Sequence, residues 1–320
     1  MPDRNSAATA FPVAGPALLV FISSTSFIAA RAVAPNADPI LFLLVRFLLV
    51  AVGFALLARR VAWPKAGQIV GHLLAGMIIS GVYLVASWWA VAHGLSAGVM
   101  TLLGSLQPLF AALAATLLLR RGIGYRTWLG LGFGLAGVAL VLSPRLQQVD
   151  AAGVPLLPVA IGLVGIISLT VGTMMQKSSL AEADLRAAGS VQHLGAAIVA
   201  AVALPLFGTG QWNNVPSLWL SLGWSVIGLS LAGTSLFIWL VRRGDVTRVT
   251  SLMLLVPPAT ALQAWFLFEE RLTIVQIAGF AVTLIGVVIV QRTGSMPRSV
   301  NARHEAIAIG RAFNLRWRPK

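Results

Sequence analysis

A single arginine, Arg46, lies within an otherwise apolar stretch of the chain, seven positions after Pro39. A charge inside a membrane-spanning helix is costly and usually faces the interior of a helix bundle. A guanidinium carries a planar fork of N–H donors that matches the two oxygens of a carboxylate. Arg46 is therefore a candidate to bind the carboxylate of a small molecule. The alternative is a structural ion pair with Asp38, one to two helical turns away.

Other polar side chains lie near the middle of apolar stretches, where a mostly apolar pocket would place a few orienting groups. His193, or its neighbour Gln192, occupies the position in the seventh stretch that corresponds to Arg46 in the second. His193 is a candidate for contact with substrate or a proton, although a lone histidine among apolar residues also serves as a packing partner. The remaining candidates carry hydroxyl or amide groups, which can equally join one helix to another: Ser26, Ser80, Tyr83, Gln107, Ser168, Ser230, Thr234 and Thr260.

The apolar stretches contain neither cysteine nor acidic residues in their interiors, which excludes several kinds of chemistry. The chain has no cysteine, and its nine acidic residues all lie outside the interiors of these stretches. An intramembrane enzyme needs a nucleophile with a base, or metal ligands, at membrane depth. We therefore expect no catalytic residue, no metal and no cofactor. The lack of buried carboxylates also argues against direct carboxylate-based proton or sodium coupling.

One glycine-rich motif has the pattern of a nucleotide-binding sequence in the wrong context. The run "GFGLAG", from Gly132 to Gly137, fits G-x-G-x-x-G. A dinucleotide site needs a strand before this motif and a helix that begins within it, whereas here the motif lies inside an apolar stretch. Gly130 and Gly134, four residues apart, are instead expected to let a second helix approach closely.

Composition assigns the chain to the membrane proteins. Hydrophobic residues make up 58% of the 320 residues and charged residues only 10%, whereas soluble domains carry about 25% charged residues. A membrane span needs about 20 mostly apolar residues. We predict an all-α integral membrane protein with ten transmembrane helices, at 12–33, 39–58, 67–92, 96–119, 125–143, 156–176, 186–207, 216–241, 247–268 and 273–291.

The basic residues predict the orientation of these spans. With the N-terminus in the cytoplasm, nineteen of the 23 Lys and Arg residues lie on the cytoplasmic side, three lie outside and Arg46 lies within a span. Cytoplasmic loops carry an excess of Lys and Arg, so both termini are predicted to be cytoplasmic, in the plasma (inner) membrane. The net charge of +14 therefore does not indicate nucleic-acid binding. The basic tail at 293–320 either binds anionic lipid at the inner leaflet or only helps to fix the orientation.

When the chain is aligned with itself at an offset of about 150 residues, identical residues coincide at several positions, which indicates an internal repeat. At a shift of 150, Ser80 meets Ser230, Trp89 meets Trp239 and Pro108 meets Pro258, and at 149, Gly130 meets Gly279 and Gly137 meets Gly286. These matches pair spans 3, 4 and 5 with spans 8, 9 and 10. Because each copy holds five spans, the second copy enters the membrane from the opposite side. Inverted repeats are typical of secondary transporters, whose sites lie near mid-membrane between the copies.

Prolines mark the middle of two repeat-equivalent spans. Pro108 lies in "LQPLF", and Pro257 and Pro258 lie in "LVPPAT". Proline removes a backbone hydrogen bond and kinks or breaks a helix, which a span tolerates where protein or a water-filled cavity surrounds it. We expect these prolines to be gating elements, although proline is also commoner in membrane helices in general.

Aromatic residues near the span ends are expected to form interfacial belts. This expectation covers Trp88, Trp89, Trp239 and Trp265, and His72 is also expected at an interface. Because Trp89 and Trp239 correspond in the repeat, these two residues are additional candidates for gates on opposite sides.

Three stretches carry a resemblance to a known family. They are "SSTSFIAARAVAPNADPILFLLVRF" in spans 1–2, "LGSLQPLFAALAATLLL" in span 4, and "LMLLVPPATALQAWFLFEERLTIVQIAGFAVTLIGVVIV" in spans 9–10. Over residues 14–292 the chain resembles the drug/metabolite transporter superfamily, of the ten-span EamA type. The resemblance matches Arg31 and Arg46 to the family's basic residues in spans 1 and 2, and Glu270 to its glutamate after span 9.

The resemblance implies a secondary transporter that moves a small metabolite, such as an amino acid or an amphipathic compound, by export or exchange. The chain then divides into an N-terminus at 1–11, a first repeat at 12–143, an outer connector at 144–155, a second repeat at 156–292 and the tail at 293–320. The alternatives are an intramembrane enzyme that acts on lipid and an assembly subunit that transports nothing. The sequence leaves the oligomeric state open.

Overall fold

A computed structural model describes residues 14–118, 125–147, 156–179, 183–236, 240, 253–270 and 272–293. Within these ranges the regular structure is helical, apart from an isolated bridge between Ala37 and Trp212. Six of the described helices are long and apolar enough to cross a membrane, judged by length and composition. The prediction of an all-α membrane protein is therefore confirmed. The basic tail lies outside the described ranges.

Helices occur at every one of the ten predicted spans. The first half holds α1 (Ala14–Val33), α2 (Pro39–Leu57), α3 (Ala66–Gly76), η1 (Met77–Val82), α4 (Tyr83–Ala92), α5 (Ala97–Ser105), α6 (Gln107–Leu118) and α7 (Tyr125–Gln147). The second half holds α8 (Leu156–Ser179), α9 (Leu185–Phe207), α10 (Pro216–Gly223), η2 (Trp224–Ala232), η3 (Met253–Leu255), α13 (Val256–Phe268) and α14 (Ile274–Thr293). α3, η1 and α4 form one continuous span, as do α10 and η2.

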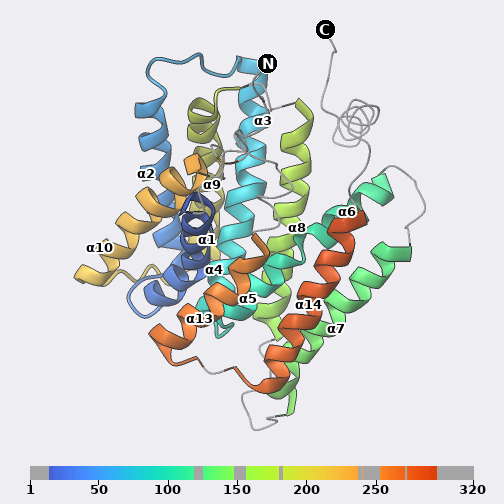
Figure 1. Ribbon diagram of the computed structural model, residues 1–320. Helices are drawn as coiled ribbons and strands as arrows, with labels where there is room; N and C mark the ends of the chain where they lie inside the picture. Colours follow the sequence, from blue (N-terminus) through green and yellow to red (C-terminus); the bar gives the residue numbers. More distant parts are fainter. Residues whose placement is uncertain are drawn as a thin grey trace, which may run out of the picture.

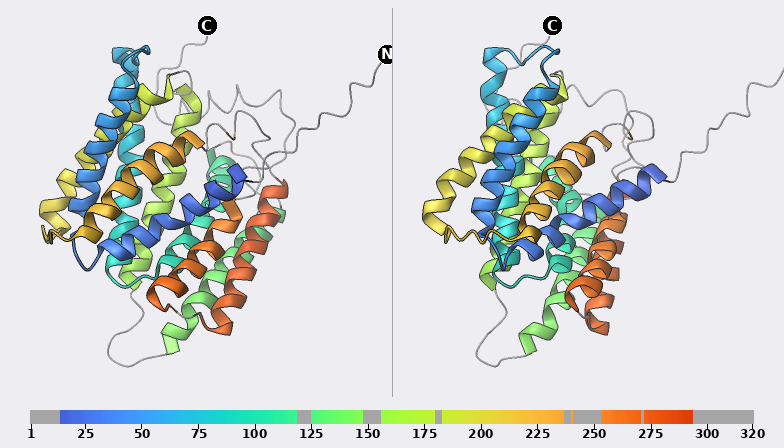
Figure 2. Two further views of the ribbon diagram at one scale, coloured as in Figure 1. Left: turned by 60° about the vertical axis from the view of Figure 1, so that its left-hand side comes forward. Right: turned by 90° about the vertical axis from the view of Figure 1, so that its left-hand side faces the viewer.

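The helices α7 and α14, spans 5 and 10, lie side by side (Figures 1 and 2). A Cβ added at Gly137 would lie 2.6 Å from the carbonyl oxygen of Gly279, and one at Gly279 would lie 2.7 Å from that of Gly137. A Cβ at Gly286 would lie 2.6 Å from the carbonyl oxygen of Gly130. The expected close approach at the span-5 glycines is confirmed, and the partner is the repeat-equivalent helix.

The contacts between α2 and α9, spans 2 and 7, follow the same pattern. The Ser190 hydroxyl donates to the Ala51 carbonyl at 2.9 Å, and Phe54 packs against Gly189. Residues nearer the end of α2 contact residues nearer the start of α9, so the two helices are antiparallel. Equivalent helices that pack antiparallel are what two inverted five-helix repeats require.

The breaks in spans 4 and 9 lie just before the prolines. Leu106 separates α5 from α6, and Pro108 is the second residue of α6. In the second repeat the 3₁₀ turn η3 leads into α13, and Pro257 is the second residue of that helix. Proline fits the first turn of a helix, because N–H groups there have no partner within the helix. Each proline therefore begins a half-helix rather than bends a continuous one.

Asp38 holds the start of α2 to the loop that follows α9. Its side chain caps α2 by accepting from Ile40 N at 2.7 Å, and it also accepts from the backbone N–H groups of Thr209 and Gly210. Gly210 has a φ of +66°, which a residue with a side chain adopts at a cost. Asp38 itself is 3% exposed.

Replacement of Asp38 distinguishes capping from ion pairing. We expect Asp38→Ala to lower stability by about 1–3 kcal/mol, because the buried N–H of Ile40 and the N–H groups of Thr209 and Gly210 lose their acceptor. Asp38→Asn keeps an acceptor oxygen and should cost much less. The measurement is the thermal midpoint of the purified protein in detergent. An equal loss for the two variants would contradict capping and favour a role for the negative charge.

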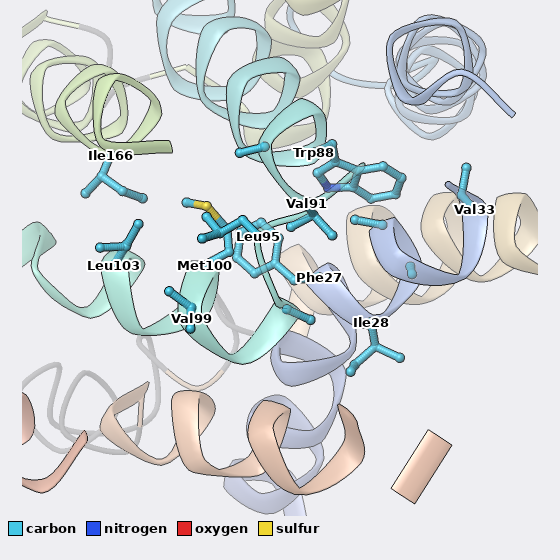
Figure 3. Packing of buried hydrophobic residues seen from close by; sticks show 14 of the residues in the cluster. Phe27, Ile28, Val33, Trp88, Val91, Leu95, Val99, Met100, Leu103 and Ile166 are labelled. Carbon is cyan, nitrogen blue, oxygen red and sulfur yellow. The ribbon is translucent and has the colours of Figure 1, made fainter. Parts of the chain in front are cut away.

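The buried core joins both repeats. Its members come from α1, α2, α4, α5 and α9, among other elements. Figure 3 shows Phe27 of α1 among Leu95 and Met100, with Trp88 of α4 beside Val91. Trp88 is completely buried. The expectation that it belongs to an interfacial belt is therefore wrong, because α1 and α2 cover the end of α4 on which it lies.

Candidate substrate site

Arg46 lies in the interior of the bundle, with 5% of its surface exposed. Its Nε and Nη2 donate to the Ser230 hydroxyl, at 3.3 Å and 3.1 Å. Within the described part of the chain, its Nη1 is buried and has no hydrogen-bond partner. Since Arg46 belongs to the first repeat and Ser230 to the second, this contact spans the interface between them.

Aromatic residues hold the guanidinium in place. The Cζ atom of Arg46 lies 5.6 Å from the centroid of the Trp88 ring, within the range of a cation–π interaction. The other neighbour of Trp88 is Phe42, one turn before Arg46 on α2, at 5.3 Å between ring centroids and an interplanar angle of 22°. Trp88 was missed as a site residue, because its place four residues before the end of the span is typical of a belt.

The ion pair between Arg46 and Asp38 is not formed. The carboxylate of Asp38 is engaged by backbone N–H groups at the end of the bundle, as described above. Salt bridges in the described ranges join Arg31 to Glu270 and Arg186 to Asp184. The cation in the interior therefore has no carboxylate in contact with it in these ranges, and a buried charge without a counter-charge is costly.

Tyr83 begins α4, the helix that carries Trp88, and the ring centroid of His193 lies 6.2 Å from that of Phe47, the residue after Arg46. The Nδ1 atom of His193 is 2.8 Å from the carbonyl oxygen of Gly189, and its ring packs against Phe54. A neutral imidazole that donates from Nδ1 satisfies this geometry. These side chains form a cluster at the repeat interface together with Arg46, Ser230 and Trp88.

Gln192, the other counterpart of Arg46, contacts a different residue. Its Nε2 lies 3.4 Å from His72 Nδ1, between α9 and α3. His72 is completely buried, so the expectation that it is interfacial is wrong. The reason is that α9 of the second repeat covers the face of α3 on which it lies.

The remaining candidates divide between helix packing and exposed positions. The hydroxyl of Thr260 donates within the bundle to the carbonyl oxygen of Ser24 at 3.0 Å, and Gln263 Nε2 donates to the hydroxyl of Ser24 at 2.7 Å. These bonds join α13 to α1. Gln107 Nε2 reaches Thr173 Oγ1 at 3.5 Å. Ser26 and Ser80 are half-buried, and Thr234 is exposed.

Of the two tryptophans that are candidate gates, one stacks on a residue outside this cluster and the other lies outside the described ranges. Trp89 stacks on His93 at 3.7 Å between ring centroids, near the end of span 3. Trp239 lies outside the described residues. Arg31 lies in the last turn of α1, and Glu270 follows the end of α13. The Nε atom of Arg31 lies 3.5 Å from Oε1 of Glu270. This salt bridge joins the first repeat to the second.

The model of the EamA-like transporter family matches residues 13–143 and again residues 156–292. The chain belongs to this family. A relative named "Uncharacterized transporter sll0355", from Synechocystis sp., is 24% identical over 291 residues, which cover 85% of this chain and 87% of the relative. A solved crystal structure at 18% identity has a TM-score of 0.61 and covers 88% of this chain and 98% of its own. At that identity the likeness shows a shared fold.

Family membership makes this EamA-like protein a membrane transporter built from two repeats. The two matches of the family model correspond to the two halves whose helices pack antiparallel. For an EamA-like transporter, a buried polar cluster between the repeats is the position at which a substrate is expected to bind.

Proposed function

We propose that this EamA-like transporter moves a small metabolite that carries a carboxylate, and that Arg46 binds this carboxylate. The observation that carries the proposal is the buried guanidinium whose Nη1 lacks a partner and whose contacts are a hydroxyl and an aromatic ring. A carboxylate would supply the missing charge and accept two parallel hydrogen bonds. Amino acids and amphipathic acids both carry such a group.

Transport proceeds in this proposal by alternating access between the two repeats. The half-helices that begin at Pro108 and Pro257 are the elements that move, one in each repeat. The Arg31–Glu270 salt bridge closes the outer side, since it joins the ends of spans 1 and 9. Export or exchange fits the lack of intramembrane carboxylates for ion coupling. Both termini are cytoplasmic, in the plasma membrane.

Reconstitution into liposomes tests the proposal. The purified protein is assayed for uptake and counterflow with labelled amino acids and organic acids, each beside its neutral amide. Compounds that carry a carboxylate should be transported and their amides should not, because an amide has no negative charge for Arg46. Equal transport of an acid and its amide, or transport of no compound, would refute the proposal.

The orientation has its own test, which the lack of native cysteine makes simple. A single cysteine that replaces Glu269 should react with an impermeant thiol reagent added to intact cells, because spans 1 and 9 end outside. A cysteine that replaces Arg60, in the exposed turn after α2, should react only after lysis. The reverse pattern would place both termini outside.

A further inference from the structure

Two π-helical segments interrupt spans 3 and 8 at positions that the internal repeat makes equivalent. η1 covers Met77–Val82 and η2 covers Trp224–Ala232, so a shift of 150 residues places η1 inside η2. Well under about 1% of residues in proteins are π-helical, and such turns are frequent at functional sites. A matched pair in two copies is a property of the repeat rather than a local irregularity.

Glycines five residues apart accompany both segments. They are Gly76 and Gly81 at η1, and Gly223, Gly228 and Gly233 at η2. In an α-helix, side chains five residues apart point about 140° apart. With the π-helical turn between them, Gly76 and Gly81 both face α9: a methyl at Gly76 would overlap the carbonyl oxygen of Gln192, and one at Gly81 would lie 2.8 Å from Val199 Cβ.

The two segments are held in place by different interactions. In η1, the carbonyl oxygen of Ile78 accepts from the hydroxyl of Ser168 on α8, at 2.7 Å. In η2, the hydroxyl of Ser230 accepts from Arg46 on α2. The first is a bond between neutral groups of two spans that pack together. The second occupies two N–H donors of Arg46, the residue that binds the substrate in the proposed function.

We infer that Ser230 is a positioning residue that holds Arg46 until an anion binds, and that its release changes the helical register of η2. This inference rests on the proposed function. A carboxylate brings a counter-charge and accepts two parallel hydrogen bonds from a guanidinium, whereas a hydroxyl brings neither the charge nor the second oxygen, so a carboxylate displaces the hydroxyl. A π-helical turn holds one residue more than an α-helical turn. If this turn becomes α-helical, the extra residue leaves the turn, and the helix that follows the segment rotates by about 100°.

The consequence is a link between the binding site and Gly233–Leu236, the described residues that follow η2. Residues after η2, beginning with Gly233 and Thr234, turn when the site fills. η1 keeps its register, because its anchor on Ser168 does not involve the anion. The two repeats therefore respond differently to one substrate although their backbones are equivalent.

Hydrogen exchange measured by mass spectrometry tests the response directly. The probes are formate and benzoate, with formamide and benzamide as neutral controls. We expect the acids to change backbone exchange in peptides that cover η2 but not in those that cover η1, and the amides to change neither. Arg46→Met should abolish the effect. Equal responses of η1 and η2, or no response to either acid, would overturn the inference.

Kinetics in liposomes supply a second test, with the compound that the carboxylate panel identifies. Ser230→Ala should lower apparent KM about 3- to 10-fold, since a competing hydrogen bond is lost, and should also lower the maximal rate. Ser230→Thr keeps the hydroxyl and should restore both values. Ser190→Ala is the matched control, because it removes a buried hydroxyl bond from α9 to α2 that does not involve Arg46. It should leave apparent KM unchanged.

The two proposals fail differently. If Arg46→Ala impairs transport while Ser230→Ala leaves apparent KM and maximal rate unchanged, the proposed function stands and the inference is wrong. If Arg46→Ala transports at the wild-type rate, the proposed function fails, and the inference with it. A loss of maximal rate in Ser230→Ala and Ser190→Ala alike would show a packing role and overturn the inference.

Discussion

Replacement of Arg46 by Ala should raise the apparent KM for a carboxylate substrate about 100-fold or more, or abolish transport. Hydrogen bonds to charged groups contribute about 1.5–3 kcal/mol each, and a carboxylate bound to the guanidinium fork makes two of them. Arg46→Lys should restore transport in part, because a point charge remains while the planar fork is lost. The measurement is uptake into liposomes at matched protein content.

Stability separates this role from a structural one. Arg46→Met replaces a buried charge without a carboxylate partner by an apolar side chain of similar length. We expect the thermal midpoint of Arg46→Met to stay the same or rise, because such a charge is costly to bury. Arg60→Ala, at the exposed end of the same span, should change neither transport nor stability. A marked loss of stability in Arg46→Met would instead show that the arginine holds the fold together.

The second large effect is expected at the contact between α7 and α14. Gly137→Ala would place a methyl on the hydroxyl of Thr283 and 2.6 Å from the carbonyl oxygen of Gly279. Real Cβ atoms do not approach so closely, so one helix must move. Overpacking of this kind costs about 1–3 kcal/mol. The thermal midpoint should fall and the yield of monodisperse protein with it.

A matched change lies five residues earlier on the same helix. A Cβ at Gly132 would meet no heavy atom within 4 Å. Gly132→Ala should therefore leave stability unchanged or raise it slightly, because Ala favours helix more than Gly does. If the two variants were equally stable, the close approach of α7 and α14 would be a dispensable contact.

Much of the fold could be predicted from the chain because its signals are long and repeated. The lengths of the apolar runs define the spans, and the matches at Gly130 and Gly137 indicate that spans 5 and 10 are equivalent in the repeat. Arg46 and Ser230 could both be selected as polar groups at membrane depth. Their contact could not be predicted, because it depends on how the two repeats pack.

The features that escaped prediction depend on contacts between the repeats or on a local change of register. Trp88 and His72 lie near span ends, and they are buried because helices from elsewhere in the fold cover them. Asp38 is close to Arg46 in sequence, but the N–H groups of a helix start compete for its carboxylate. The π-helical segments leave hydropathy unchanged. Their one trace in the sequence is the five-residue spacing of glycines.

The antiparallel contacts of α2 with α9 and of α7 with α14 have a consequence for biosynthesis. α7 and α14 pack most extensively on each other, and α2 packs most extensively on α9. The first five spans therefore leave the ribosome with two large faces uncovered: that of α2 until span 7 is inserted, and that of α7 until span 10, the last, is inserted. Separately expressed halves should be degraded alone and accumulate together, as the two chains of an obligate heterodimer do.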